Sequence, residues 1–259
     1  MSSLLNLQIL NLQRCNALHS LPSAITQLSN LRRLGLGGTP INQVPKGIGE
    51  MEFINDLEGF PIGAGGDNGK TQDGWKLEEL EHLSQLRRLD MVKMERATPY
   101  STDSLLTEKK HLKILSLYCT KRTYEPYSEE DVSNIEKIFE KLIPPPNLED
   151  LCISRFFGRR TGGHQLERAP IKTVVEDFPF LFETLLIDGC GGLERVSNLP
   201  QVGELRANRC PALRCVEGLG SLQQLWLDEG MKELSSLWIP GLQQEHKQRH
   251  GEDLDVYDW

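Results

Sequence analysis

Apolar residues recur along the chain with a spacing that itself repeats. The first line of them is Leu7-x-x-Leu10-x-Leu12-x-x-Cys15-x-x-Leu18-x-x-Leu21-Pro22-x-x-Ile25-x-x-Leu28. The second is Leu31-x-x-Leu34-x-Leu36-x-x-Thr39-x-Ile41-x-x-Val44-Pro45-x-x-Ile48-x-x-Met51, which begins 24 residues later and contains one slip at Ile41. An internal repeat of this length predicts a solenoid, in which each coil buries its apolar face against its neighbours.

The spacing within one line predicts the structure of one coil. The alternating Leu-x-Leu is expected to be a short strand whose leucines point into the coil. The Leu-Pro segment that follows turns and returns along the outside. We therefore predict an α/β leucine-rich-repeat solenoid with a short-stranded parallel sheet on its concave face and irregular or helical returns on its convex face.

Seven more copies follow the first two. They start at Ile54, Leu86, Leu112, Leu148, Phe182, Val202 and Leu222, and the copy at Ile54 has Gly59 in place of its third leucine. The solenoid is expected to span residues 1–237 in about nine repeats, with insertions near 61–82, 95–111 and 121–147. Residues 238–259 are expected to form a C-terminal cap or tail.

The segments between copies differ in pattern. Apolar residues at helical spacing predict a convex helix over 131–143 with Asp131 as its N-cap, ended by Pro144. Residues 95–108 and 157–177 are polar and are expected to be loops. The last three copies repeat every 20 residues, which leaves room only for extended returns. In the tail, 239–241 breaks the repeat, 242–250 suits a short helix, and 251–259 either caps the last coil or is disordered.

Composition narrows the possible functions of the chain. Its 259 residues carry a net charge of −8, which argues against a nucleic-acid-binding module. No apolar run is long enough to span a membrane, and the start has no secretory signal. Cys15, Cys190 and Cys210 share one repeat position, so the six cysteines do not suggest a disulfide framework, and a cytoplasmic location is expected. The first coil has no polar cap, which predicts that the chain is the C-terminal portion of a longer protein.

Three stretches invite a chemical interpretation that their spacing does not support. Residues 63–71 resemble a phosphate-binding loop, but Ala64 stands where that motif needs glycine, so a glycine-rich loop is expected. Cys210 with Cys215, and His246 with His250, are pairs without the further ligands that zinc requires. No metal, cofactor or catalytic site is therefore predicted, and we expect a non-enzymatic protein.

The positions between the strand leucines give the candidate binding surface. The two residues before the second leucine of each copy are mainly basic in the early copies and acidic in the later ones, and adjacent strands make them contiguous. Arg206 and Trp226, between the strand leucines, are expected to form a cation–π pair. The predicted partner-binding residues on the concave face are Arg32, Arg33, Arg87, Arg88, Lys113, Glu149, Asp150, Glu183, Glu204, Arg206 and Trp226. The alternative is that these charges serve only solubility.

Residues outside the repeat make the resemblance specific. The chain resembles the leucine-rich-repeat region of plant intracellular disease-resistance receptors, which carry an N-terminal coiled coil and a central nucleotide-binding switch domain. The Leu-x-x-Leu-Pro-x-x-Ile-x-x-Leu return is typical of them. Segments 57–63, 75–80, 86–89 and 251–257 are similar to members from grasses.

The resemblance implies a role in innate immunity. The repeat region would sense a pathogen effector, or a host protein that an effector alters, and would restrain the switch domain. ADP or ATP would bind only to that other domain, which this chain lacks. The alternative is the substrate-recognition repeat of a ubiquitin ligase. An F-box-like segment upstream would indicate the ligase, whereas a nucleotide-binding domain there would indicate the receptor.

Overall fold

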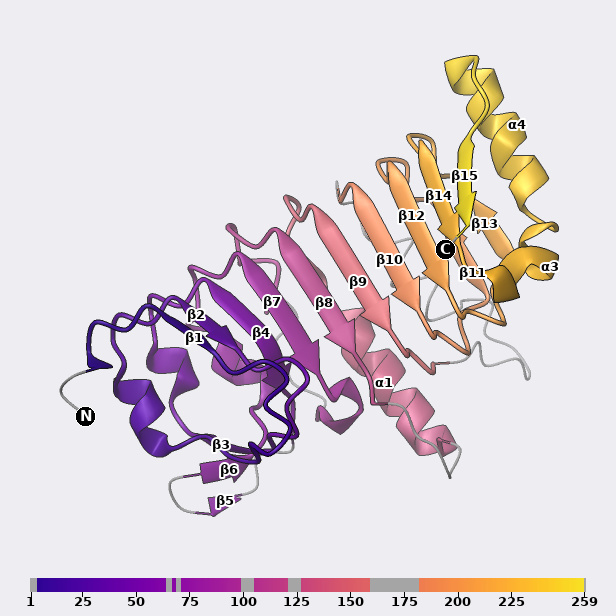
Figure 1. Ribbon diagram of the computed structural model, residues 1–259. Helices are drawn as coiled ribbons and strands as arrows, with labels where there is room; N and C mark the ends of the chain where they lie inside the picture. The colour runs from indigo at the N-terminus through magenta and orange to yellow at the C-terminus, as the bar shows by residue number, and fades with distance from the viewer. Residues whose placement is uncertain are drawn as a thin grey trace.

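The computed structural model describes residues 4–63, 67–68, 71–98, 105–120, 127–158 and 182–258. A curved parallel sheet runs the length of the molecule, and its strands follow one another in chain order (Figure 1). In these residues the sheet has ten strands: β1 (Ile9–Asn11), β2 (Arg33–Gly35), β4 (Asp56–Pro61), β7 (Arg88–Val92), β8 (Ile114–Tyr118), β9 (Asp150–Ser154), β10 (Thr184–Asp188), β12 (Glu204–Asn208), β14 (Gln224–Leu227) and β15 (Asp255–Asp258). The first nine lie in the nine copies recognised in the sequence.

The strand leucines form one continuous ladder inside the solenoid. Each pairs in register with the same position of the next coil, as Leu34 does with Leu57 and Leu57 with Leu89. The members from β2 to β14 are at most 2% exposed: Leu34, Leu57, Leu89, Leu115, Leu151, Leu185, Leu205 and Leu225. Burying one such side chain stabilises the fold by about 1.5–3 kcal/mol before entropy is counted, so the ladder supports the predicted solenoid.

The copy that lacks its third leucine contains a β-bulge. The register between β4 and β7 shifts between Glu58 and Phe60, and Phe60 rather than Gly59 pairs with Met91. Gly59 has a φ of +78°, and a Cβ atom there would lie 2.5 Å from the backbone nitrogen of Gly37. Glycine is therefore required, and Phe60 fills the leucine position.

The convex returns are mostly single turns and short strands. Five 3₁₀ helices are described: η2 (Ser23–Gln27), η3 (Ile48–Glu50), η4 (Leu77–Leu80), η5 (Met94–Arg96) and η6 (Glu229–Met231). In the tight coils near the C-terminus, β11 (Arg195–Ser197) and β13 (Cys215–Glu217) pair in parallel on the return side. These extended returns agree with the 20-residue spacing.

Two insertions add structure to this plan. β3 (Gln43–Pro45) and β5 (Asp67–Asn68) both pair antiparallel with β6 (Thr71–Asp73), so part of the glycine-rich stretch is a hairpin rather than a loop. Helix α1 (Glu129–Lys141) is the expected convex helix (Figure 1). Its N-cap is Ser128, not Asp131, because Asp131 closes the capping box as its third helical residue. Residues 64–66, 69–70, 99–104 and 159–181 lie outside the described part, which leaves most of the expected loop at 157–177 untested.

The tail closes the C-terminal end of the solenoid. Helix α3 (Lys232–Ser235) leads to helix α4 (Ile239–His250), and β15 then returns as the last strand of the sheet (Figure 1). Residues 239–241, expected only to break the repeat, begin α4, because proline is well tolerated in the first turn of a helix. Trp238, Leu242 and Leu254 are each at most 5% exposed, so this segment packs against the last coil.

Candidate functional site on the sheet

Two rows of side chains cross the outer face of the sheet. The first row holds the residue before each strand leucine, or before Val256 in β15: Ile9, Arg33, Asp56, Arg88, Ile114, Asp150, Thr184, Glu204, Gln224 and Asp255. The middle row holds the residue after that leucine: Asn11, Gly35, Glu58, Asp90, Ser116, Cys152, Leu186, Arg206, Trp226 and Tyr257. Because strand side chains alternate, the rows share the face opposite the leucine ladder.

The structure divides the predicted binding residues between this face and its edge. Six lie on the face: Arg33, Arg88, Asp150, Glu204, Arg206 and Trp226. The other five precede their strands by one residue and lie at the edge where the strands begin: Arg32, Arg87, Lys113, Glu149 and Glu183. The expectation that both residues before the leucine face the same way was wrong, because each strand begins one residue later and alternation turns only the second residue outward.

Most of these charges have a partner within the chain. Arg33 pairs with Glu58 at 2.6 Å, and Arg88 pairs with Asp90 at 3.3 Å. Two further pairs join predicted residues to each other, Lys113 with Glu149 at 2.7 Å and Arg206 with Glu204 at 2.6 Å. The middle-row carboxylates Glu58 and Asp90 were missed by the sequence analysis. They give the basic half of the face a local counter-charge, so that half is less basic than expected.

Arg32 and Arg87 differ from the other predicted arginines. Both side chains are exposed, and within the described ranges neither forms an ion pair. They line a groove of about 670 Å³ at the strand-start edge, together with His82 and the 54% exposed Phe53. Arg32, Asn55 and Arg87 hold the same position in three successive coils, which places the arginine backbones about 10 Å apart. We call this hollow the edge groove.

Asp90 is an unfavourably placed acid in the middle row. The residue is 8% exposed, and burial raises the pKa of its carboxyl, although Arg88 and Ser116 lower it.

Cys152, in the middle row of β9, donates its thiol proton to the hydroxyl of Tyr118 on β8 at 3.8 Å. Burial raises the pKa of the Cys152 thiol to about 11, so this cysteine remains a neutral thiol at physiological pH.

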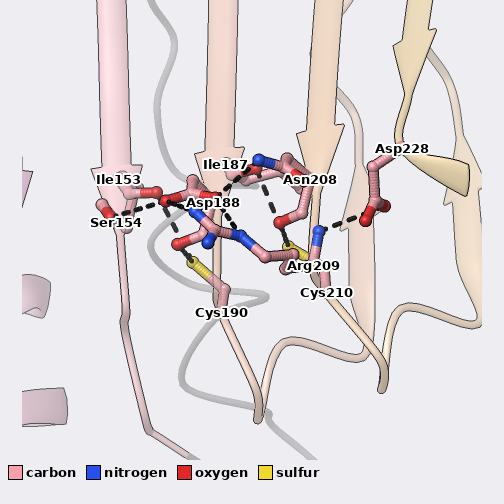
Figure 2. Close-up of polar contacts among 9 residues, drawn as sticks. All are labelled: Ile153, Ser154, Ile187, Asp188, Cys190, Asn208, Arg209, Cys210 and Asp228. Atoms are coloured by element: carbon pink, nitrogen blue, oxygen red, sulfur yellow. Dashed lines mark hydrogen bonds and ion pairs between the residues drawn. The ribbon is translucent and has the colours of Figure 1, made fainter. Parts of the chain in front are cut away.

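Asp188, at the end of β10, joins three adjacent strands (Figure 2). Its carboxylate accepts hydrogen bonds from Ser154 Oγ at 3.2 Å and from Asn208 Nδ2 at 2.9 Å. The Arg209 guanidinium donates to both oxygens, at 2.7 and 3.0 Å. Every donor to Asp188 comes from a neighbouring coil, so this cluster stabilises the stacking of the coils.

In six coils the turn after the strand carries a left-handed residue at the same repeat position. Glycine occupies it in two coils, at Gly38 and Gly189. A long basic residue occupies it in four, at Arg14, Lys93, Arg155 and Arg209. A non-glycine residue is strained in this conformation, so the backbone alone would favour glycine in all six coils. The spacing of the leucines does not predict that this position is left-handed.

The cysteines that share a repeat position have a structural role. Cys190 and Cys210 are fully buried, and each thiol donates to backbone carbonyl groups, as Cys210 does to Asn208 O at 3.2 Å (Figure 2). All six cysteines are free thiols. Cys15 is exposed, and among the described residues no coil covers it from the N-terminal side.

An aromatic stack stands at the C-terminal end of the middle row. The Arg206 guanidinium carbon lies 5.6 Å from the Trp226 ring centroid, which is the expected cation–π geometry. On the other side of Trp226, Tyr257 stacks at 4.3 Å with 20° between the ring planes. The sequence analysis missed Tyr257, because the tail has no repeat pattern that would place it beside β14.

Other stretches of possible chemical interest show no convergent site. Among the described residues there is no group of three or more potential metal ligands. The ring centroids of His246 and His250 lie 4.6 Å apart on α4, and His250 Nε2 is 3.0 Å from the Gly220 carbonyl oxygen. No helix in the described ranges is both long and apolar enough to cross a membrane.

Comparison with known proteins defines the family. A family model described as a leucine-rich repeat region matches residues 1–163. The curated proteins yielded no match. Among solved structures, a leucine-rich-repeat protein of Leptospira interrogans is similar, with a TM-score of 0.47 and 18% identity over 96% of this chain, which spans 54% of that protein. Because the family model covers more than half of the residues, the chain belongs to the leucine-rich-repeat family.

Proposed function

We propose that the chain is a protein-recognition module of plant innate immunity, acting in the cytoplasm without catalysis. In a longer receptor it would sense a pathogen effector or a modified host protein and restrain a nucleotide-binding switch domain. The family supports the general role, because leucine-rich repeats commonly bind proteins on their extended surfaces. The immune role rests on the resemblance of segments 57–63, 75–80 and 251–257.

The edge groove identifies the residues that would bind the partner in this proposal. Arginine and aromatic side chains dominate the energetics of protein interfaces, and this groove is lined by Arg32, Arg87 and the exposed Phe53. Both arginines lack an ion-pair partner among the described residues, so their charge is available to a carboxylate of another protein. The acidic Glu50 and Glu52 also line the groove. The groove would therefore select a partner by the positions of its charges rather than by net charge.

The proposed partner at this groove is an acidic surface of the switch domain. The test is the double variant Arg32→Glu/Arg87→Glu in the full-length receptor, expressed in plant cells. Loss of docking is expected to raise effector-independent cell death several-fold, measured as ion leakage.

The matched control is Arg214→Glu, which reverses an exposed arginine just before β13 on the return side. This control is expected to leave the receptor silent without effector. Unchanged autoinhibition together with an unchanged effector response in the double variant would remove the edge groove from the proposal.

A further inference from the structure

The aromatic stack at the C-terminal end of the sheet is arranged to continue beyond its last residue. Arg206, Trp226 and Tyr257 occupy the middle row on three successive strands, β12, β14 and β15. Tyr257 is 37% exposed, and within the described residues no strand lies beyond β15. One ring face of Trp226 receives a guanidinium and the other receives Tyr257. The outer side of Tyr257 is left as the end of the stack.

The chain itself shows how a guanidinium fits this row. Arg206 lies against the Trp226 ring, and its Nε donates to Glu204 at 2.6 Å. Glu204 is two residues before Arg206, on the same side of the strand. The guanidinium of Arg206 is thus stacked on the Trp226 ring and hydrogen-bonded to the Glu204 carboxylate.

The outer end of the stack offers the same two kinds of group, an aromatic ring and a carboxylate, although here both lie on one strand. Tyr257 supplies the ring, and Asp255 is two residues before it on the same side of β15. The Tyr257 hydroxyl donates to Asp255 Oδ2 at 3.4 Å, and Asp255 is the main reason why the pKa of Tyr257 is raised. Asp258 lies nearby but already pairs with Lys232 at 3.3 Å. Asp255 has no basic partner among the described residues.

We propose that Tyr257 and Asp255 form a subsite for an arginine side chain of a protein partner. The guanidinium would stack on Tyr257 as Arg206 stacks on Trp226, and it would donate to Asp255, a carboxylate on the strand of the ring, where Arg206 donates to Glu204 on its own strand. The free backbone edge of β15 would pair with the extended segment that carries the arginine, because an unpaired strand edge can accept another strand. This inference deepens the proposed recognition function and depends on it only for the identity of the partner.

The test uses a synthetic peptide, Ser-Arg-Ser-Arg-Ser-Arg-Ser, whose alternation places its arginines on one face of a strand. Binding to the full chain is measured by calorimetry and by the shift of the Trp226 indole N–H signal in NMR spectra. Replacing the arginines by citrulline, which has the same shape without the charge, is expected to abolish binding. Replacing them by lysine is expected to weaken it several-fold, because an ammonium group stacks less well on a ring.

Four variants locate the subsite. Tyr257→Ala and Asp255→Asn are each expected to weaken binding about tenfold, in line with one desolvated cation–π or charge-assisted contact. The matched controls are Leu237→Ala, an exposed apolar residue just before α4, and Glu194→Gln, an exposed acid just before β11 on the return side; both should bind like the wild type. Equal binding of the arginine and lysine peptides, or equal losses in Asp255→Asn and Glu194→Gln, would overturn the subsite in favour of general attraction to an acidic protein. Failure here would leave the edge-groove result unaffected, since the two experiments alter different residues.

Discussion

The two ends of the solenoid are built differently. At the C-terminal end, α4 and β15 cover the last coil, and Trp238, Leu242 and Leu254 are buried beneath them. At the other end, the first coil has no cover in the described residues. Leu4 and Leu5 are 51% and 46% exposed there. Stacked coils share an apolar core, so a coil without a neighbour leaves that core in water.

The outermost strands show the same contrast. In β1, Ile9 is 60% exposed, and an apolar hollow of about 310 Å³ opens among the leucines of the first coil. In β15, the exposed residues include the charged Asp255 and Asp258, which disfavour pairing with any strand that carries no basic side chain to match them. The last coil is thus covered by the segment that follows it, whereas the first coil leaves apolar side chains exposed among the described residues. The leucine pattern alone does not distinguish the two ends. They differ in whether a further segment packs on the outermost coil.

Truncating one leucine at each end gives the largest expected difference. Leu254→Ala removes a side chain that is 5% exposed and should lower the free energy of unfolding by about 2–5 kcal/mol. Leu5→Ala removes one that is 46% exposed and should change it by less than about 0.5 kcal/mol. Chemical denaturation followed by circular dichroism measures both. Equal losses would mean that the ends are covered alike.

Asp188 and Asp90 extend the contrast to the two halves of the sheet. In the C-terminal half Asp188 is fully bonded to neighbouring coils, so Asp188→Ala should lower the free energy of unfolding by about 1–3 kcal/mol. Asp150→Ala is the matched control, because no side-chain partner of Asp150 is described, and it should stay within about 0.5 kcal/mol of the wild type. A similar effect of both substitutions would show that the Asp188 cluster does not hold the coils together.

Asp90, in the N-terminal half, should behave in the opposite way. The pKa of the Asp90 carboxyl is raised in the folded state, so the folded protein binds this proton more tightly than the unfolded chain does. The charged carboxyl therefore lowers the stability of the fold at pH 7. This loss of stability decreases as pH falls toward the ordinary aspartate pKa of about 3.9. Asp90→Asn should therefore leave stability unchanged or raise it by up to about 1 kcal/mol at pH 7, because Arg88 is partly exposed and can be solvated. The gain should shrink when unfolding is measured at pH 5 and then at pH 4. A large loss at pH 7 would show that the Arg88 ion pair outweighs burial.

The smallest expected effects come from the left-handed turns. Arg14→Gly, at the open end, relieves a φ of +60° and should raise stability by about 0.5–1 kcal/mol, since within the described residues the Arg14 side chain has no ion-pair partner to lose. Arg209→Gly relieves a φ of +50° but removes the ion pair with Asp188, so it should give no gain. Thermal unfolding of both variants in parallel makes the comparison. A gain in both would mean that the Asp188 pair contributes nothing.

The sequence predicted those parts of the fold that repeat. Leucines at fixed spacing identify the coils because only stacking can bury them, and Leu34, Leu89 and Leu205 pair with their neighbours as the spacing requires. The bulge at Gly59 could not be foreseen, since the need for glycine comes from the backbone of Gly37 in the preceding coil. The start of α4 at Ile239 was missed because proline was taken only as a breaker.

The candidate site was predicted less completely than the fold. Alternation along a strand placed Arg206 beside Trp226 correctly, because both follow the same leucine in adjacent coils. The same alternation predicts the places of Glu58 and Asp90, which follow the strand leucine in the early copies as Arg206 does in a later one. Tyr257 could not be placed from the repeat. A weak signal was available in Leu254-x-Val256, whose second member pairs with Leu225.

The contact between Trp226 and Tyr257 tests the account most directly, because it exists only if the tail returns as a strand of the sheet. Nuclear Overhauser spectroscopy of the full chain measures it. With ring centroids 4.3 Å apart, strong cross-peaks between the two rings are predicted, together with cross-strand contacts between Leu225 and Val256. Random-coil shifts for residues 251–258 without ring-to-ring cross-peaks would contradict both the C-terminal cap and the arginine subsite.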